Sequence, residues 1–291
     1  MDILHTAQMP WGESLVAQRA GGDVAHKRLF EGEEDSPDNY MLVMSKEPHT
    51  FFSPRHRHPW DQIRYSLEGR IPIAKGLYVR GGELGYFPES AHYGPQEGGD
   101  DRRVLLLQFG GASGQGFIGP DRVKQAMRAL EQEGRFEGGV YHRDVAEGRR
   151  NYDAYEAIWL QVRGGELDYA PAAYSTPIVM RPESLPWRPT TQAGIARREI
   201  GVFPHRGLTL DAWQLQPGAL LSLRATPALR LLFVLSGQGR IGSEALEPWT
   251  AVRLAPGEAA ELASSTEPLQ VMQWSVSRVA DLGLPVATLP D

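Results

Sequence analysis

The stretch Arg55-His56-Arg57-His58-Pro59-Trp60-Asp61-Gln62-Ile63-Arg64-Tyr65-Ser66-Leu67-Glu68-Gly69 gathers more possible metal ligands than any other part of the sequence. Side chains alternate between the two faces of an extended strand, so residues two apart share a face. If the strand continues regularly past the proline, one face carries polar side chains and the other is apolar. The polar side chains are those of His56, His58, Gln62 and Arg64. We therefore predict a strand of which one side presents two imidazoles, an amide and a guanidinium.

A third ligand for a metal ion is expected from the later stretch Gly85-Tyr86-Phe87-Pro88-Glu89-Ser90-Ala91-His92-Tyr93-Gly94-Pro95. His92 and Tyr93 are adjacent there and compete for one position. Imidazole binds a divalent ion at neutral pH without losing a proton, whereas a phenol with a reference pKa of about 10 must be deprotonated by the metal. We therefore expect His92 to complete the metal site. Tyr93 and Gln108 are expected to be polar groups of the same pocket.

The first stretch resembles the first motif of the cupin superfamily. That motif consists of Gly, five residues, His-x-His, three or four residues, Glu, six residues and Gly. His56, His58 and Gly69 match it, and Gln62 stands at the glutamate position. The resemblance implies a metal site inside a jelly-roll barrel.

The later stretch resembles the second cupin motif, Pro-x-Gly-x-x-His, less closely. Counted from Pro88, the histidine of the motif falls on Tyr93, and His92 comes one residue early. A one-residue change in the turn would bring His92 back to the site.

The second half of the chain repeats the first. A shift of 168 residues places Gly69 on Gly237 and Pro88 on Pro256, which indicates a duplicated domain. None of the expected ligands is repeated: Arg224, Thr226, Arg230, Ala260 and Glu261 stand where the first half has His56, His58, Gln62, His92 and Tyr93. Because an arginine stays protonated, the second copy is expected to hold no metal and to serve packing, dimerisation or closure of the pocket.

The resemblance and the repeat together predict an all-β protein made of two cupin jelly-roll barrels, a bicupin, with a few connecting helices. With 22 prolines and 32 glycines, the chain also has the turn formers that many short strands require. We expect an N-terminal arm over 1–39, a metal-binding barrel over 40–115, a helical connector and linker over 116–190 and a degenerate barrel over 191–291.

Two helices are expected in the connector. The apolar spacing predicts one helix over Asp121–Glu133 and another over Tyr152–Val162. Both are expected to pack between domains and to contribute no site residue.

The composition narrows the class of protein. The formal net charge of −6 and the absence of long basic clusters argue against nucleic-acid binding. The chain has no cysteine, so disulfides and thiolate ligands are excluded. No segment has the apolar length of a membrane helix or of a secretion signal. We expect a cytoplasmic protein, a homo-oligomer such as a dimer, whose partner is a small anionic substrate.

Gentisate-type ring-cleaving dioxygenases look similar in the first motif, where His56-Arg57-His58, Arg64 and Leu67-Glu68-Gly69 match. The similarity implies a non-haem Fe(II) dioxygenase with one divalent ion per chain, acting on a small carboxylate, enolic or aromatic substrate. Zn, Mn, Ni or Cu remain open as the native ion. Arg64 is expected to grip a carboxylate or enolate, or else to form an ion pair with Asp61 or Glu68.

Two further classes of function stay open. Because Gln62 replaces a carboxylate, the ion would carry more positive charge, which suits a non-oxidative isomerase, lyase or decarboxylase. A small-molecule-binding protein without catalysis is the third class.

Overall fold

The computed structural model describes residues 1–17, 23–145, 147–203 and 206–277 of the chain. They divide into two compact units. One unit, called the N-terminal unit here, is Trp11–Met180, and the other, the C-terminal unit, joins Met1–Pro10 to Arg181–Asp291. Within the described residues, no helix has the length and apolar character needed to cross a membrane.

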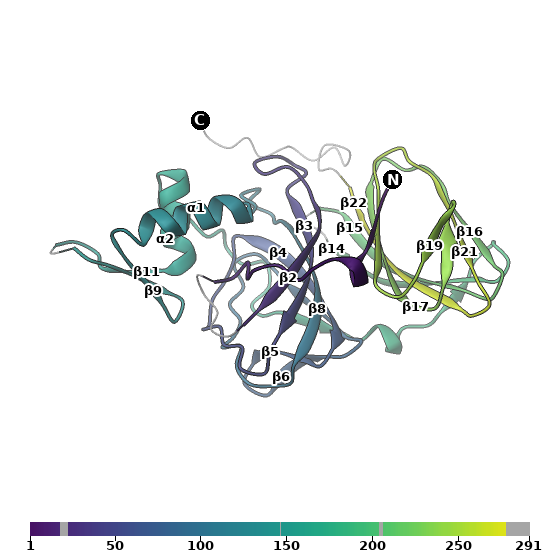
Figure 1. Ribbon diagram of the computed structural model, residues 1–291, viewed down its shortest axis with the longest axis horizontal. Coiled ribbons are helices and arrows are strands. Elements are labelled where there is room, and N and C mark those ends of the chain that lie inside the picture. Colours follow the sequence, from purple (N-terminus) through teal and green to yellow (C-terminus); the bar gives the residue numbers. More distant parts are fainter. Residues whose placement is uncertain (18–22, 146, 204–205, 278–291) are drawn as a thin grey trace. The chain divides into compact units, whose positions relative to one another are not determined.

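The N-terminal unit is built on an antiparallel six-stranded sheet, of which Figure 1 labels β2, β3, β4 and β8. The full strand order is β12-β7-β4-β8-β3-β2. A two-stranded sheet of β5 and β6 belongs to the same unit. The strands are β2 (Ala25–Glu31), β3 (Tyr40–Glu47), β4 (Trp60–Glu68), β5 (Arg70–Ala74), β6 (Leu77–Arg80), β7 (Leu84–Phe87), β8 (Arg102–Gly110) and β12 (Ile178–Met180). Strand β4 lies in the interior of the sheet between β7 and β8 and carries Gln62 and Arg64. The predicted strand does not continue back through Pro59, so His56 and His58 lie in the loop before β4.

The connector of the N-terminal unit contains the two helices that the sequence predicts, α1 (Pro120–Leu130) and α2 (Ala154–Arg163). Asp153 begins α2 by accepting hydrogen bonds from the backbone amides of Tyr155 and Glu156, and Gly164 ends it in the left-handed conformation. The short strands β9 (Gly134–Glu137), β10 (Val140–Arg143) and β11 (Asn151–Asp153) lie between the helices in sequence. Apolar side chains of both helices pack in one cluster with Trp60 of β4, so the helices close one end of the barrel.

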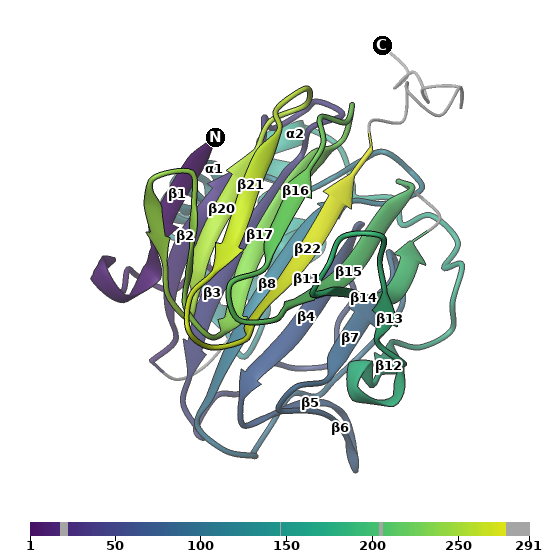
Figure 2. The same cartoon turned by 90° about the vertical axis from the view of Figure 1, so that its right-hand side faces the viewer.

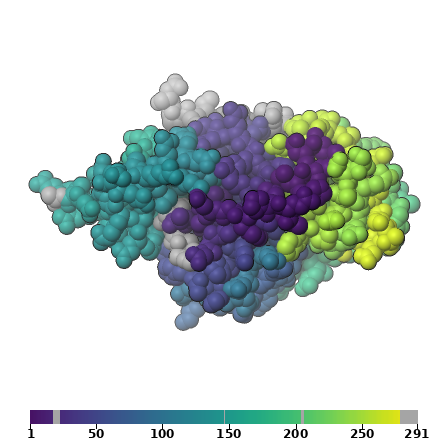
Figure 3. Space-filling view, in the orientation of Figure 1, coloured from purple at the N-terminus to yellow at the C-terminus, as the bar shows by residue number. Residues whose placement is uncertain are grey.

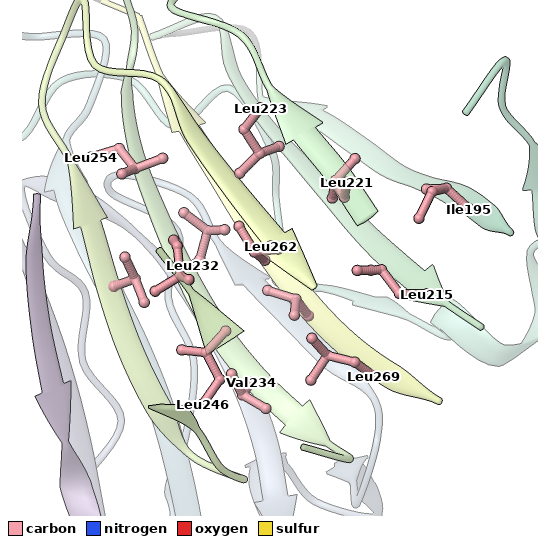
Figure 4. Close-up of a cluster of buried hydrophobic side chains, with 13 residues drawn as sticks. Ile195, Leu215, Leu221, Leu223, Leu232, Val234, Leu246, Leu254, Leu262 and Leu269 are labelled. Atoms are coloured by element: carbon pink, nitrogen blue, oxygen red, sulfur yellow. The ribbon is translucent and has the colours of Figure 1, made fainter. Parts of the chain in front are cut away.

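The C-terminal unit has a seven-stranded sheet in the order β1-β20-β17-β22-β15-β14-β13 and a four-stranded sheet in the order β16-β21-β18-β19. Its strands are β1 (Asp2–His5), β13 (Arg188–Pro189), β14 (Ile195–Phe203), β15 (Leu208–Leu215), β16 (Leu220–Leu223), β17 (Leu229–Ser236), β18 (Gly239–Ile241), β19 (Glu244–Leu246), β20 (Thr250–Leu254), β21 (Ala260–Ser264) and β22 (Leu269–Val276). Leucine, isoleucine and valine side chains fill the space between its sheets (Figure 4).

The two units repeat one topology, which confirms the predicted all-β fold of two jelly-roll barrels. The order β7-β4-β8-β3-β2 of the first unit recurs as β20-β17-β22-β15-β14 in the second. The turn glycines also correspond, because Gly69 and Gly237 both have positive φ, 76° and 81°. A side chain at either position would meet a backbone oxygen, at 2.7 Å from Asp101 O and at 2.1 Å from Pro268 O.

Each sheet gains an edge strand from an arm that precedes the other barrel in sequence. Strand β1, at the start of the chain, pairs with β20 of the C-terminal unit, and β12, which precedes the second barrel, pairs with β7 of the N-terminal unit (Figure 2). The first residues accordingly lie against residues of the C-terminal unit in the space-filling view (Figure 3).

The arms also resemble each other internally. A strand is followed by a 3-10 turn, η1 (Thr6–Gln8) or η2 (Pro182–Ser184), and then by Pro-Trp. Each tryptophan ring makes a cation–π contact with a residue of the barrel that follows it in sequence. Nζ of Lys27 lies 4.3 Å from the ring centre of Trp11, and Cζ of Arg198 lies 4.2 Å from that of Trp187.

Candidate metal and substrate site

The interior of the N-terminal barrel contains a cavity of about 110 Å³. Its walls are the inward faces of β2, β3, β4 and β8 and the loops around residues 15–16, 51–58, 96 and 117–118. Val123 of α1 and Tyr155 of α2 also line it, which corrects the expectation that the helices contribute no site residue. The lining is mixed: apolar side chains alternate with His26, Ser45, Glu47, Ser53, His56, His58, Gln62, Arg64, Gln96 and Gln108. Polar groups are seldom placed inside a narrow barrel for packing alone, so this lining indicates a binding site.

His56 and Tyr93 face each other across an antiparallel bridge. The amide of His56 donates to the carbonyl of Tyr93 at 3.0 Å, and the amide of Tyr93 donates to the carbonyl of His56 at 2.9 Å. Directly opposed residues of an antiparallel pair point to the same side, whereas sequence neighbours point to opposite sides. The bridge therefore directs the side chain of Tyr93 toward the histidines and that of His92 away from them.

Both imidazoles converge on the hydroxyl of Tyr93. The hydroxyl oxygen lies 2.8 Å from Nε2 of His56 and 2.7 Å from Nε2 of His58. The imidazole rings are 4.9 Å apart between centres, and Tyr93 is buried. Two nitrogens and one oxygen thus meet at one point beside the cavity.

The environment of His56 determines which ring nitrogen carries the proton in the neutral imidazole. Nδ1 lies 2.6 Å from the carbonyl oxygen of Pro54, and a carbonyl can only accept a hydrogen bond. In the neutral ring Nδ1 therefore carries the proton, and Nε2 directs its lone pair at Tyr93. Histidines that bind metals commonly have their second nitrogen bound to a backbone carbonyl in this manner.

Arg64 lies beside this cluster and is held by neutral groups. Its Nη2 donates to the Tyr93 hydroxyl at 2.5 Å and to Oε1 of Gln62 at 2.7 Å, and its Nη1 donates to Oε1 of Gln96 at 3.3 Å. The guanidinium also lies over the ring of Phe87, 4.4 Å from its centre. Because a guanidinium only donates, the amide atom of Gln62 that faces it must be the oxygen.

The alternative ion pairs of Arg64 are not formed. Asp61 instead accepts hydrogen bonds from the hydroxyl of Tyr86 and the amide of Glu89, and Glu68 pairs with Arg103. Among the residues that the structure describes, none forms an ion pair with Arg64. Its charge therefore faces a partly buried site in which no carboxylate balances it.

The structure does not bring His92 to the site, which corrects the expectation that it completes the metal centre. His92 is exposed, and partial burial together with Arg55 and Arg57 holds its pKa below the ordinary value. The turn keeps the register of the cupin motif: Ser90 stands at the glycine position of Pro-x-Gly-x-x-His and adopts the left-handed conformation, with φ 63°. Tyr93 consequently occupies the position of the motif histidine.

Sequence reasoning missed two cavity residues, Gln96 and His26. Gln96 is buried in a second bridge, with Ser53, and donates to the carbonyl of Pro72 at 3.0 Å. His26 of β2 accepts the amide hydrogen of Leu15 at Nδ1, 3.1 Å away, and burial lowers its pKa to about 4. Neither residue belongs to a motif, so only the strand pairing could have revealed them.

The residues present fit a metal ion through an unusual set of donors. Within the described residues, no group of three His, Cys, Asp or Glu side chains is placed to hold an ion. Two imidazole nitrogens and the oxygen of Tyr93 nevertheless meet, and a deprotonated phenol with imidazoles suits first-row divalent ions. Gln62 could add an amide oxygen only by releasing Arg64.

The C-terminal barrel differs at the equivalent positions. Arg224 is exposed there, and Arg230 is buried and donates to the carbonyl of Glu258 at 2.5 Å. These side chains donate hydrogen bonds and cannot coordinate a cation.

No protein-family model matches the chain, and no curated protein matches it either. Several solved structures, however, match the chain in fold. A proposed dioxygenase from Nostoc punctiforme matches with a TM-score of 0.64 at 10% identity, over 100% of this chain and 87% of that one. Oxalate decarboxylase from Bacillus subtilis matches with a TM-score of 0.55 at 12% identity, over 95% of this chain and 76% of that one. A proposed glyoxylate-induced protein from Pseudomonas aeruginosa matches with a TM-score of 0.56 at 11% identity, over 94% and 84%. These likenesses establish the cupin fold across both barrels.

Proposed function

We propose that the N-terminal barrel binds one divalent metal ion through His56, His58 and Tyr93 and acts as a dioxygenase on a small anionic substrate. The observation that carries the proposal is the convergence of two imidazole nitrogens on one phenolic oxygen, within 2.8 Å, beside the barrel cavity. Fe(II) would supply the electrons for dioxygen chemistry, whereas a redox-inactive ion would supply Lewis acidity.

In this proposal Arg64 holds the carboxylate or enolate of the substrate. A guanidinium forms paired hydrogen bonds with such a group, and a substrate carboxylate would take the place of the neutral amide oxygens of Gln62 and Gln96 that now accept from it. The amides of Gln62 and Gln96 fix the guanidinium plane before the substrate arrives. Arg64 also stabilises negative charge on the oxygen of Tyr93, which must lose its proton to bind an ion.

The cavity volume favours aliphatic over aromatic substrates. A dry cavity of about 150 Å³ accommodates benzene, and the cavity here measures about 110 Å³. A substituted aromatic acid is larger than benzene and would require the barrel to expand. We therefore propose a short-chain acid as the substrate.

Elemental analysis and oxygen uptake test this proposal together. Protein purified without added metal should contain close to one ion per chain, and His56→Ala should lose most of it. His92→Ala is the matched control, because its exposed imidazole lies outside the site. Oxygen uptake should then accompany turnover of a short-chain acid. A protein that stays metal-free when it is offered Fe(II), Mn(II) or Zn(II) would overturn the proposal.

A second candidate is a non-oxidative lyase or decarboxylase. The supporting observation is that no carboxylate belongs to the cluster, since Gln62 stands at the glutamate position and its oxygen binds Arg64. An ion held by fewer anionic ligands is the stronger Lewis acid. Turnover under strictly anaerobic conditions, with no oxygen consumed in air, would favour this candidate over the dioxygenase.

A further inference from the structure

The cavity contains a second recognition element, Gln108, which the proposed function does not use. Gln108 lies on β8, directly between Gln62 of β4 and Met41 of β3 in the sheet register. All three side chains line the cavity. Gln108 thus belongs to the wall next to the metal cluster and outside it.

The amide of Gln108 has no hydrogen-bond partner in the described part of the chain, although the residue is only 7% exposed. Its neighbours differ in this respect, since the amide oxygens of Gln62 and Gln96 both accept hydrogen bonds from Arg64. The polar atoms of this amide are not fully buried, because they face the cavity. A ligand in the cavity can therefore take the place of water as their hydrogen-bond partner.

We propose that Gln108 hydrogen-bonds a second oxygen of the substrate and thereby restricts the site to short acids that carry a hydroxyl or oxo group near the carboxylate. The inference rests on the proposed function, because it takes Arg64 as the carboxylate-binding group. It goes further by naming a substrate class, the 2-hydroxy and 2-oxo acids, and the residue that selects it.

The sheet register sets the length of the substrate. Arg64 is paired with Leu106, so Gln108 is its diagonal neighbour on the adjacent strand. Diagonal neighbours lie about 7–8 Å apart, a separation that two side chains can span with a compact ligand between them. A carboxylate at the guanidinium then leaves the next one or two carbon atoms of the substrate within reach of the amide. A 2-hydroxy or 2-oxo group fits this spacing, and a short acid of this kind matches the cavity volume of about 110 Å³.

Gln108 presents both a donor and an acceptor, so it accommodates both members of this class. The NH2 group donates to an oxo oxygen, and the amide oxygen accepts from a hydroxyl group. An aliphatic acid without the second oxygen would leave the amide unpaired, which is the usual origin of strong discrimination against such analogues.

Propionate, lactate and pyruvate test the proposal, because they share a three-carbon skeleton and differ only at the second carbon. We would measure their affinities by calorimetry, without oxygen, on the metal-containing protein. Wild-type protein should bind lactate and pyruvate about tenfold or more tightly than propionate. Gln108→Leu should reduce this preference to about twofold while propionate binds as before.

Met41→Leu is the matched control, because it alters the other neighbour of Gln108 without removing a polar group. It should keep the tenfold preference. If Gln108→Leu keeps it too, the metal alone selects the second oxygen, and the role of Gln108 is overturned while the proposed function stands. If wild-type protein binds none of the three acids, both proposals fail. Thermal unfolding of each variant would verify that the barrel remains folded.

Discussion

The hydroxyl oxygen of Tyr93 lies 2.8 Å from Nε2 of His56, and the two residues face each other across one antiparallel bridge. In the proposed metal site, this relationship puts a tyrosine in place of a histidine as the third donor. It also connects the metal ligands to Arg64, whose guanidinium donates to the same oxygen.

Replacing Tyr93 with Phe should weaken metal binding by at least about tenfold, because the ring remains packed while the phenolic oxygen between the two imidazoles is lost. Titration against a coloured chelator measures this affinity. His92→Ala should bind metal as tightly as the wild type. If His92→Ala instead lost metal affinity while Tyr93→Phe kept it, His92 would be the ligand.

Arg64→Lys should lower kcat/KM or substrate affinity by about 1.5–3 kcal/mol, since lysine keeps the charge and loses the planar pair of donors. Metal content should not change. Arg103→Lys is the control, because Arg103 forms an exposed ion pair with Glu68 on the neighbouring strand. Normal turnover by the Arg64 variant would show that this guanidinium does not grip the substrate.

His26 should make the N-terminal unit less stable in acid. Burial lowers its folded pKa from 6.5 to about 4, so between these values the unfolded chain binds the extra proton. The contribution of the neutral ring is complete above pH 6.5 and is lost as the pH falls toward 4, where the loss reaches about 3 kcal/mol.

Urea unfolding of wild type and His26→Gln at several pH values checks this prediction. The glutamine variant should lose less stability than the wild type between pH 6.5 and 4. Parallel pH curves for the two proteins would contradict the assignment. Glu47, whose charge opposes the lowering of the His26 pKa, is the neighbouring group to vary next.

The two arm strands offer a matched comparison of packing. Ile3 of β1 packs against the apolar core of the C-terminal barrel, whereas Ile178 of β12 is 38% exposed. Ile3→Ala should therefore lower the unfolding free energy of the C-terminal unit by about 1–2 kcal/mol, and Ile178→Ala should change stability by less than about 0.5 kcal/mol. Chemical denaturation measures both. Equal effects would mean that β1 contributes backbone pairing alone.

Alternation along one strand describes Gln62 and Arg64 of β4, but His56 and His58 lie in the loop before that strand, where the bridge between His56 and Tyr93 positions them. The choice between His92 and Tyr93 required more, because it depends on how a second segment pairs with the first. Ligand chemistry favoured the imidazole, whereas the bridge to His56 selects the phenol. Backbone pairing prevails because shifting it by one residue would turn buried side chains outward.

The repeated turn at Gly69 and Gly237 predicted the duplicated barrel, because a conserved spacing of turn residues reflects one topology used twice. The strand with which each arm pairs, β20 for β1 and β7 for β12, could not be predicted in the same way. Pro10-Trp11 and Pro186-Trp187 showed a loose correspondence in sequence, but strand periodicity does not identify the partner strand. In the folded chain, β1 and β12 pair with β20 and β7 and become the edge strands beside them.

The pairing of β1 with β20 sets an order of events during synthesis on the ribosome. Strand β12 follows its partner β7 by fewer than a hundred residues, so the N-terminal barrel can close its edge while the second barrel is still being made. Strand β1 precedes its partner β20, which begins at Thr250, by more than two hundred residues. The residues of β1 must therefore remain unpaired while the whole N-terminal barrel is made, and the C-terminal barrel closes this edge only after β20 has been made.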